Sequence, residues 1–366
     1  MASQVETVDH ELLQTDPLTL SAWILTQQHR SPGARGRLTV LLNAIGVGCK
    51  FVASAVRRAG LAGMMGMAGS ENVQGEDQKK LDVIANEVFK NSLRRSGQCC
   101  ILITEEEDEP IFIEKEHRGI YIVVRGCPWV EAHSAGLVGR FLQQAAPQDA
   151  VDFSVGTIFG IYKAKDPQAE LAGNSTLEDV LRPGTEMVAA GYCMYGSMAY
   201  MMITTGNGVA GFTLDPTLGE FVITHPKVQV PPRGTIYSIN EGNAANWDPA
   251  TTKYVENCKS GQYNNGKPYS LRYVGSMVAD VHRTLLYGGI FMYPADKKSP
   301  SGKLRVLYEC FPMAFLVEQA GGKATTGTSR TMEIVPTSIH GRAPIYLGSK
   351  EEVEEIERLK KECGCQ

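Results

Sequence analysis

The segment 272–309 constrains the fold of this chain more than any other stretch of the sequence. Apolar side chains recur at helical spacing over 276–286, which predicts an amphipathic helix. The short apolar run 289–293 predicts a strand, and the run 294–302, rich in Lys, Ser, Pro and Gly, predicts a turn. Lys303 opens the next segment. Two buried elements are therefore expected to hold a cationic turn in a fixed place.

The same segment carries side chains that suit a sugar phosphate. Arg272 and Tyr273 precede the predicted helix, Tyr293 ends the predicted strand, and Lys303 and Glu309 follow the turn. Arginine forks, lysine ammonium groups and tyrosine hydroxyls are good donors to phosphate and sugar oxygens. On pattern alone, a helix and a strand joined by a solvated basic turn explain these residues about equally well.

Further motifs follow one another along the chain in a recognisable order. They are KKLDV (79–83), SVGTIFGIY (154–162), GYCMYGS (191–197), DPTLGEF (215–221), NEGN (240–243) and the run 308–348. Together with 272–309 they closely resemble the fructose-1,6-bisphosphatase family of class 1, and NEGN resembles its plant-type cytosolic members. The resemblance covers the chain from about Asp16 to about Glu355.

This resemblance implies both a fold and an activity. The fold is α/β, a layered α-β-α-β-α sandwich of the sugar-phosphatase type. The activity is hydrolysis of the 1-phosphate of fructose 1,6-bisphosphate to give fructose 6-phosphate, with Mg²⁺, in gluconeogenesis and sucrose synthesis. An N-terminal regulatory and metal-binding domain is expected over 1–205, and a C-terminal sugar-phosphate-binding domain over 206–366. Four apolar runs separated by turns predict a second sheet layer: 188–195, 199–205, 208–214 and 221–224.

The composition fits an ordinary soluble enzyme. With 366 residues, of which 43% are hydrophobic and 21% charged, the chain can form two modest domains with full cores. A formal net charge of -4 gives no case for nucleic acid or an anionic membrane as the main partner. We expect no apolar run long enough to span a membrane, and the acidic, polar residues 1–16 predict a cytoplasmic protein.

A metal site is predicted where acidic residues follow a strand. The apolar run 99–104 is followed directly by four acidic residues, 105–108. Hard cations such as Mg²⁺ take oxygen ligands, although such a cluster alone is more typical of a solvated loop. The resemblance implies roles for five carboxylates: metal ligation by Glu76, Glu105 and Glu309, and orientation and activation of water by Asp82 and Glu106. Two to three Mg²⁺ ions per site are expected in the family, and fewer or more weakly bound ions here.

One stretch, 125–153, does not match the family. The family signature Phe-Asp-Pro-Leu-Asp-Gly-Ser-Ser-Asn should begin here; its aspartates hold metal, and its Gly-Ser-Ser backbone binds the phosphate that is cleaved. The chain instead reads RGCPWVEAHSAGLVGRFLQQAAPQDAVDF, and D-P-x-D-G occurs nowhere in its sequence. The candidates for replacing the lost groups are Asp149, Asp152, Glu131 and His133. The first two have the spacing of the lost aspartates, but no Gly-Ser-Ser follows them.

The resemblance also implies a sugar-phosphate site and a regulatory site. The predicted contacts to the sugar and its 6-phosphate are Asn240, Asn243, Arg272, Tyr273, Met277, Tyr293 and Lys303. Arg272 resembles a residue contributed across a subunit interface, which implies a homo-oligomer, a tetramer in the family. Thr39 and Tyr121 match positions of the family's inhibitory AMP site, whereas Arg37 and Ile120 depart from the animal pattern.

Three hypotheses follow for this chain. The first is an active bisphosphatase in which 125–153 replaces the signature. The second is a non-catalytic sugar-phosphate-binding or assembly subunit, and the third is a mis-spliced product of such a gene. An inositol-phosphatase function is weaker, because that group needs the same missing signature and lacks the arrangement of 297–303. We expect binding of sugar phosphate with impaired hydrolysis, because the central carboxylates are lost.

Overall fold

The computed structural model describes residues 18–58, 67–71, 77–126 and 155–365 of the chain. Of the stretch that departs from the family, Arg125 and Gly126 are described. The predicted metal ligand Glu76 and the four replacement candidates lie outside the described residues: Glu131, His133, Asp149 and Asp152.

The helices and strands of the described residues follow one another along the chain in this order. The first are α2 (Leu20–His29), α3 (Arg37–Arg58), β1 (Met67–Glu71), β2 (Asp77–Lys79), α4 (Lys80–Arg95), β3 (Cys99–Thr104), β4 (Ile111–Phe112) and β5 (Tyr121–Gly126). Next are β6 (Val155–Lys163), α6 (Pro167–Ala172), β7 (Met187–Tyr195), β8 (Ala199–Thr204), β9 (Val209–Asp215) and β10 (Glu220–Val228). The last are β11 (Ile236–Ser238), α7 (Pro249–Ser260), β12 (Ser270–Leu271), α8 (Met277–Tyr287), β13 (Ile290–Tyr293), β14 (Leu304–Arg305), a π-helix (Val306–Cys310), α9 (Phe311–Gln319), β15 (Lys323–Thr325), β16 (Arg342–Ala343), β17 (Ile345–Gly348) and α10 (Lys350–Glu362).

Two sheets dominate the described part of the chain. One has eight strands in the order β10-β9-β8-β7-β6-β5-β3-β4, and the other has five in the order β12-β11-β13-β17-β15. The prediction that the runs 188–224 build a second layer is wrong. β7 to β10 extend the first sheet, because β6 pairs with β5 on one side (Gly160 opposite Val124) and with β7 on the other (Ile158 opposite Tyr192).

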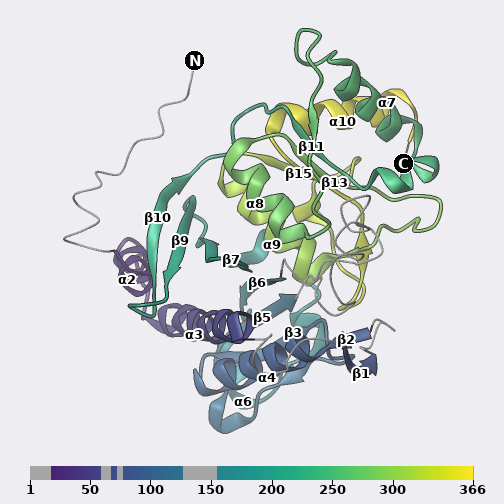
Figure 1. Cartoon of the computed structure of the whole chain (residues 1–366). Coiled ribbons are helices and arrows are strands. Elements are labelled where there is room, and N and C mark those ends of the chain that lie inside the picture. The colour runs from purple at the N-terminus through teal and green to yellow at the C-terminus, as the bar shows by residue number, and fades with distance from the viewer. Residues whose placement is uncertain (1–17, 59–66, 72–76, 127–154, 366) are drawn as a thin grey trace.

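The layers stack as helix, sheet, helix, sheet, helix (Figure 1). Helices α2, α3 and α4 cover the outer face of the large sheet, where their apolar side chains share one core with β3 and β7. Helices α8 and α9 lie between the two sheets, and α7 and α10 cover the far face of the smaller one. The predicted α-β-α-β-α sandwich is confirmed.

Helix α8 forms and packs as its spacing predicts. Val278, Val281 and Leu285 are fully buried, and Gly288 ends the helix with a φ of 75°. A Cβ at Gly156 would lie 2.4 Å from Cγ2 of Val278, so glycine on β6 allows α8 to approach this closely. This packing places the start of α8, which carries the predicted sugar-binding residue Met277, close to the large sheet.

Helix α3 corrects one prediction from composition. Its 22 residues are long and apolar enough to cross a membrane, contrary to our expectation for the chain. Leu41, Ile45 and Cys49 on this helix are almost completely buried against the large sheet, so its apolar residues serve the core of the protein. This is the pattern of a core helix, and the helix gives no case for a membrane span.

Candidate active site at the ends of the strands

The acidic loop begins where β3 leaves the large sheet. All six residues of β3 are buried, and Oγ1 of Thr104 accepts a hydrogen bond from the backbone N–H of Glu106 at 3.0 Å, which fixes the first turn of the loop. β3 runs parallel to β5 with Thr104 opposite Arg125, so Glu105 leaves the sheet beside Gly126. The predicted acidic residues therefore lie at the carboxyl end of two parallel strands, where α/β proteins bind ligands.

Glu309 approaches the same place from the C-terminal part of the chain. It lies on the π-helix, a rare conformation that is frequent at functional sites, and its side chain is 5% exposed. Its Oε2 accepts a hydrogen bond from the backbone N–H of Arg305 at 2.7 Å. A Cβ at Gly126 would lie 3.6 Å from Cγ of Glu309 and 3.1 Å from the carbonyl oxygen of Tyr308. Glu309 thus faces the end of β5, next to the start of the acidic loop.

These carboxylates suit a hard divalent cation, but the ligand set is incomplete among the described residues. Glu105 and Glu309 offer oxygen ligands from both sides of Gly126. In the ranges that the structure describes, no group of three or more His, Cys, Asp and Glu side chains could hold a metal ion, and Glu76 falls outside them. Gly126 stands where the first aspartate of the family signature would follow β5, and it offers no carboxylate.

A network that the sequence did not predict holds the acidic loop on its α4 side. The guanidinium of Arg125 is 1% exposed, lies 4.8 Å from the ring centre of Phe89, and donates to Oδ1 of Asn86 at 3.4 Å. The amide nitrogen of Asn86 in turn donates to the Glu107 carboxylate at 3.2 Å, and Lys90 forms an ion pair with the same carboxylate at 2.9 Å. The loop is therefore anchored to α4 through Glu107.

Asp82 lies within the first turn of this same helix. Its side chain is 5% exposed, and the buried face of α4 packs against the core of the large sheet. The predicted role of this residue in orienting water requires an approach to the acidic loop, and α4 also carries Asn86 and Lys90, which contact that loop.

The predicted sugar-phosphate residues gather at the carboxyl ends of three parallel strands. β12, β11 and β13 run parallel in the smaller sheet, with Leu271 opposite Tyr237 and Ser238 opposite Phe291. The residues that follow these strands at this one edge are Arg272 and Tyr273 after β12, Asn240 after β11, and Tyr293 at the end of β13. Asn243 lies in the short helix after Asn240, and its N–H donates to the Asn240 carbonyl at 3.1 Å.

Tyr293 connects this group to the acidic residues. Burial raises the pKa of the Tyr293 hydroxyl, and the nearby hydroxyl of Tyr273 and carboxylate of Glu309 raise it further. Met277 begins α8 and is 5% exposed, whereas Lys303 ends the turn before β14 and offers its carbonyl to Arg305 at 3.0 Å. The carboxylate of Glu309 therefore acts electrostatically on Tyr293, which links the predicted sugar-phosphate residues to the predicted metal ligands.

Asp280 is a buried residue that sequence analysis missed at this site. Its oxygens accept the backbone N–H groups of Val274 and Gly275 at 3.1 Å, and one oxygen forms an ion pair with Arg283 at 2.8 Å. The carboxylate is fully buried, and burial raises its pKa. It thereby clamps the loop 272–276, which carries Arg272 and Tyr273, onto α8. The Asp-x-x-Arg spacing on the predicted helix was the available signal.

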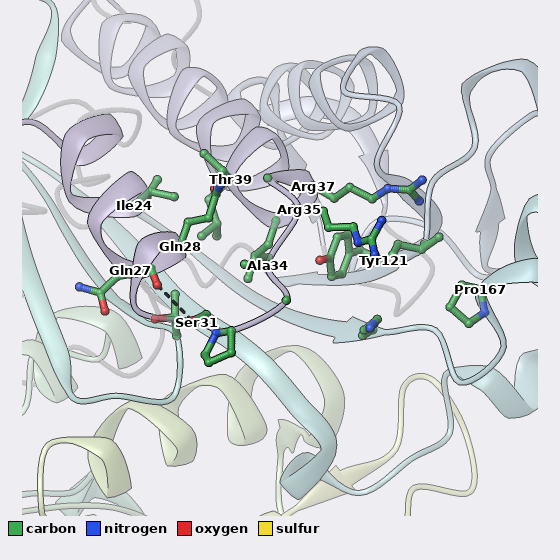
Figure 2. A pocket seen from close by; sticks show the side chains of 18 of the residues that line it. Ile24, Gln27, Gln28, Ser31, Ala34, Arg35, Arg37, Thr39, Tyr121 and Pro167 are labelled. Carbon is green, nitrogen blue, oxygen red and sulfur yellow. Dashed lines mark hydrogen bonds between the residues drawn. The ribbon is translucent and has the colours of Figure 1, made fainter.

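The predicted regulatory residues line one cavity in the N-terminal part. The cavity measures about 620 Å³ and lies between α2, α3, β5 and α6 (Figure 2). Both Thr39 and Tyr121 line it, as do Arg37 and Ile120. The Thr39 hydroxyl donates to Oε1 of Gln28 at 2.6 Å. Burial raises the pKa of Tyr121, while the charge of Arg37 opposes that rise.

This cavity has a cationic lining that suits an anionic ligand. Arg35, Arg37 and Lys163 all line it, and Figure 2 shows Arg35 and Arg37 close to Tyr121. No acidic side chain is among the residues that form the described wall of this cavity. A phosphate-bearing ligand would therefore meet positive charge without an opposing carboxylate on the wall.

Comparisons with known proteins agree over nearly the whole chain. A cytosolic fructose-1,6-bisphosphatase of Oryza sativa subsp. indica is 55% identical and one of Spinacia oleracea is 54% identical, each over 356 residues, 96% of this chain and 98% of the relative. The solved structure of the Leishmania major fructose-1,6-bisphosphatase in holo form matches with a TM-score of 0.82 and 40% identity. That match covers 94% of this chain and 99% of the other.

Two family models divide the chain between them. The model for the fructose-1,6-bisphosphatase N-terminal domain matches residues 18–128 and 147–226, and the model for the C-terminal domain matches 230–361. The N-terminal model leaves 129–146 unmatched, a shorter stretch than the predicted departure over 125–153, because residues 125–128 and 147–153 match the model. On both sides of this gap the matches continue in the family's order, and the chain belongs to the fructose-1,6-bisphosphatase family.

Proposed function

We propose that this chain hydrolyses the 1-phosphate of fructose 1,6-bisphosphate in the cytosol, with Mg²⁺, and does so more slowly than its relatives. The observation that carries the proposal is the meeting of two groups of residues at one place. Tyr293, at the edge that gathers Arg272, Tyr273 and Asn240, lies close enough to Glu309 for that carboxylate to raise its pKa. A sugar phosphate bound at this edge would present one end to the carboxylates.

The residues have distinct roles in this proposal. Arg272, Lys303, Tyr273 and Tyr293 bind the sugar and its 6-phosphate by donating to phosphate and hydroxyl oxygens. The metal ligands are Glu76, Glu105 and Glu309, and Asp82 and Glu106 orient the attacking water and take its proton. Bound Mg²⁺ would offset the charge of the phosphoryl oxygens, which matters because phosphate monoesters are among the slowest compounds to hydrolyse without a catalyst.

The reduced rate of hydrolysis in this proposal follows from the residues at the end of β5, where the carboxylates of the family signature are missing. The family depends on metal, and its signature places two carboxylates and a phosphate-binding turn after this strand. Here Gly126 faces Glu309 without a carboxylate, and part of 125–153 is unmatched by the family model. Fewer anionic ligands bind a divalent cation more weakly and hold water less accurately.

The division of labour follows the two halves of the chain. We assign regulation and most of the metal ligands to 1–205, and sugar-phosphate binding to 206–366. The cationic cavity supports this division, because its lining residues run from Ile24 to Thr205. Its ligand in this proposal is AMP, held by Thr39, Tyr121 and the cationic side chains. The Thr39 hydroxyl is already bonded to Gln28, so AMP would have to compete for that donor.

A homotetramer is the proposed assembly. Arg272 is exposed, and in the described chain its Nη1 donates to the neighbouring carbonyl of Leu271 at 2.8 Å. Its remaining donors can reach a second copy, as the family resemblance implies. Leu271 at the end of β12 and Val274 in the loop 272–276 are also exposed, at 37% and 44%, which supports an interface there.

The experiment that tests the proposal measures phosphate release from fructose 1,6-bisphosphate by the purified chain. We expect release that requires Mg²⁺ and stops when the metal is chelated, with fructose 6-phosphate as the organic product. Fructose 6-phosphate should also bind without turnover. Absence of both release and binding from a folded sample would contradict the proposed function.

A further inference from the structure

His340 lies between the acidic loop and the π-helix. It belongs to the turn before β16, and β16 pairs with β14, with Arg342 opposite Arg305. The backbone N–H of Val306, the first residue of the π-helix, donates to the Gly341 carbonyl at 2.7 Å. These backbone contacts hold the backbone next to His340 against the start of the π-helix.

Both ring nitrogens of His340 make hydrogen bonds, one to each half of the predicted metal site. Nε2 lies 3.2 Å from the carbonyl oxygen of Glu107 on the acidic loop, and Nδ1 lies 2.9 Å from the hydroxyl of Tyr308, the neighbour of Glu309. A carbonyl oxygen only accepts, so Nε2 carries the hydrogen, and Nδ1 of the neutral ring accepts from Tyr308. The two rings also meet edge to face, with centroids 5.9 Å apart.

The charges around the ring are consistent with its neutral form. Burial lowers the pKa of His340, and the guanidinium of Arg305 on β14 lowers it further, whereas the backbone of Glu107 and the carboxylate of Asp108 favour the charged ring. A neutral ring donates from one nitrogen and accepts at the other, as the two contacts require.

The contact to Glu107 closes a chain of interactions around the acidic loop. On its other side, the Glu107 carboxylate is held by Asn86 and Lys90 of α4. The loop that carries Glu105 is therefore held at Glu107 in two ways. The Glu107 side chain binds α4, and the Glu107 carbonyl accepts from His340 in the C-terminal half. Among these contacts, the one through His340 joins the loop to the π-helix that carries Glu309.

We propose that His340 is a positioning residue of the active site, which ties the acidic loop 105–108 to the π-helix and so sets the placement of Glu105 relative to Glu309. It touches neither substrate nor metal in this role. The proposal rests on the proposed function, since the placement matters only where the two carboxylates share a ligand. Groups that orient metal ligands typically change metal affinity or activity by ten-fold or more when removed.

Two conservative variants separate the contacts of His340. In His340→Gln the amide can donate to the Glu107 carbonyl from about the place of Nε2. In His340→Asn the shorter amide can accept from Tyr308 at about the place of Nδ1 but does not reach Glu107. His340→Ala removes both contacts, and His117→Ala, at an exposed histidine in the short helical turn before β5, is the control.

The experiment uses the full chain and three readouts. They are amide hydrogen exchange of peptides that cover 104–110, Mg²⁺ affinity by calorimetry, and kcat and KM for fructose 1,6-bisphosphate. We expect His340→Ala and His340→Asn to exchange about ten times faster in 104–110 and to bind Mg²⁺ about ten-fold more weakly, with KM little changed. His340→Gln should restore most of both losses, and His117→Ala should behave as the unchanged chain.

Equal exchange and equal Mg²⁺ affinity in folded His340→Ala would overturn the proposal. So would a loss in His340→Gln as large as in His340→Asn, because the effect would then not depend on the Glu107 contact. If His340→Ala fails to fold, the Gln and Asn pair decides. Hydrogen exchange in 104–110 can be measured without catalysis and without metal. If the unchanged chain releases no phosphate, the proposed function is contradicted, but the exchange measurement still tests the role of His340.

Discussion

The clamp of Asp280 on the loop 272–276 leads to a prediction that separates ligand binding from stability. The change is Asp280→Asn, which keeps the shape of the side chain and removes its charge. The asparagine loses the ion pair with Arg283, and its NH₂ group points a donor toward the backbone N–H groups of Val274 and Gly275. The loop that carries Arg272 and Tyr273 should then lose its fixed conformation.

The magnitude follows from the number and burial of these contacts. A hydrogen bond to a charged group contributes about 1.5–3 kcal/mol, and breaking one side of a buried ion pair costs about 3–5 kcal/mol. Because Arg283 is partly exposed and can be solvated, we expect the free energy of unfolding to fall by about 3 kcal/mol. We expect the dissociation constant of fructose 6-phosphate to rise about ten-fold, equivalent to about 1.4 kcal/mol.

The assay pairs urea unfolding with calorimetric binding of fructose 6-phosphate. The matched control is Asp215→Asn, at a carboxylate that also accepts two backbone N–H groups, at 2.7 and 3.1 Å, but ends β9 and caps the turn to β10. Its binding constant should stay within two-fold of the unchanged chain. Binding by folded Asp280→Asn that is as tight as that of the control would refute the clamp.

Three further predictions concern Gly126 at the end of β5, His282 on α8 between the two sheets, and Arg37 in the cationic cavity. Gly126→Asp adds a carboxylate toward Glu309, so without metal the variant should unfold at a lower temperature than the unchanged chain. With Mg²⁺ its unfolding temperature should rise more than that of the unchanged chain, and its turnover number should be higher. Equal rises of the unfolding temperature on adding Mg²⁺ would contradict this prediction. Burial lowers the pKa of His282 to about 4, so its neutral form stabilises the fold above pH 6.5, and that contribution is lost as the pH falls toward 4. When the pH is lowered from 7.5 to 4.5, the free energy of unfolding should fall about 2–3 kcal/mol more in the unchanged chain than in His282→Gln. Urea titration of both proteins at both pH values measures this difference. Arg37→Ala should weaken AMP binding several-fold in calorimetry without changing KM, and unchanged AMP affinity would remove Arg37 from that site.

Local patterns in the sequence predicted the elements because their side chains have a clear period. The spacing of Val281 and Leu285 predicted α8, and the apolar run after Gly289 predicted β13; both lie within a residue or two of the predicted bounds. The layered sandwich itself came from the family resemblance. The continuous eight-stranded sheet was not predicted, because the pairing of β6 with β5 and β7 is a contact between distant segments that no local period encodes.

The candidate site shows the same limit. The acidic run after β3 and the cationic segment 272–309 were recognisable from their chemistry. The parallel pairing within each sheet explains why the residues of each group lie at one strand edge. Asp280 was missed because it acts through the backbone N–H groups of the loop before α8, which have no sequence pattern. His340 was missed because its partner Glu107 is 233 positions away and a lone histidine carries no pattern. Arg125, with its buried guanidinium, stands where the family signature begins with phenylalanine. Its contact with Asn86 joins distant parts of the chain and is seen only in the fold.

The most direct test of this account is the turnover number of the purified chain on fructose 1,6-bisphosphate with saturating Mg²⁺, measured beside the 55% identical Oryza sativa relative. Fructose 6-phosphate affinity is measured on the same two samples. The account predicts similar affinities for fructose 6-phosphate and a turnover number at least ten-fold lower for this chain, because the sugar residues are retained and the signature carboxylates are not. Equal turnover numbers would contradict it and would show that residues 125–153 rebuild the lost ligands.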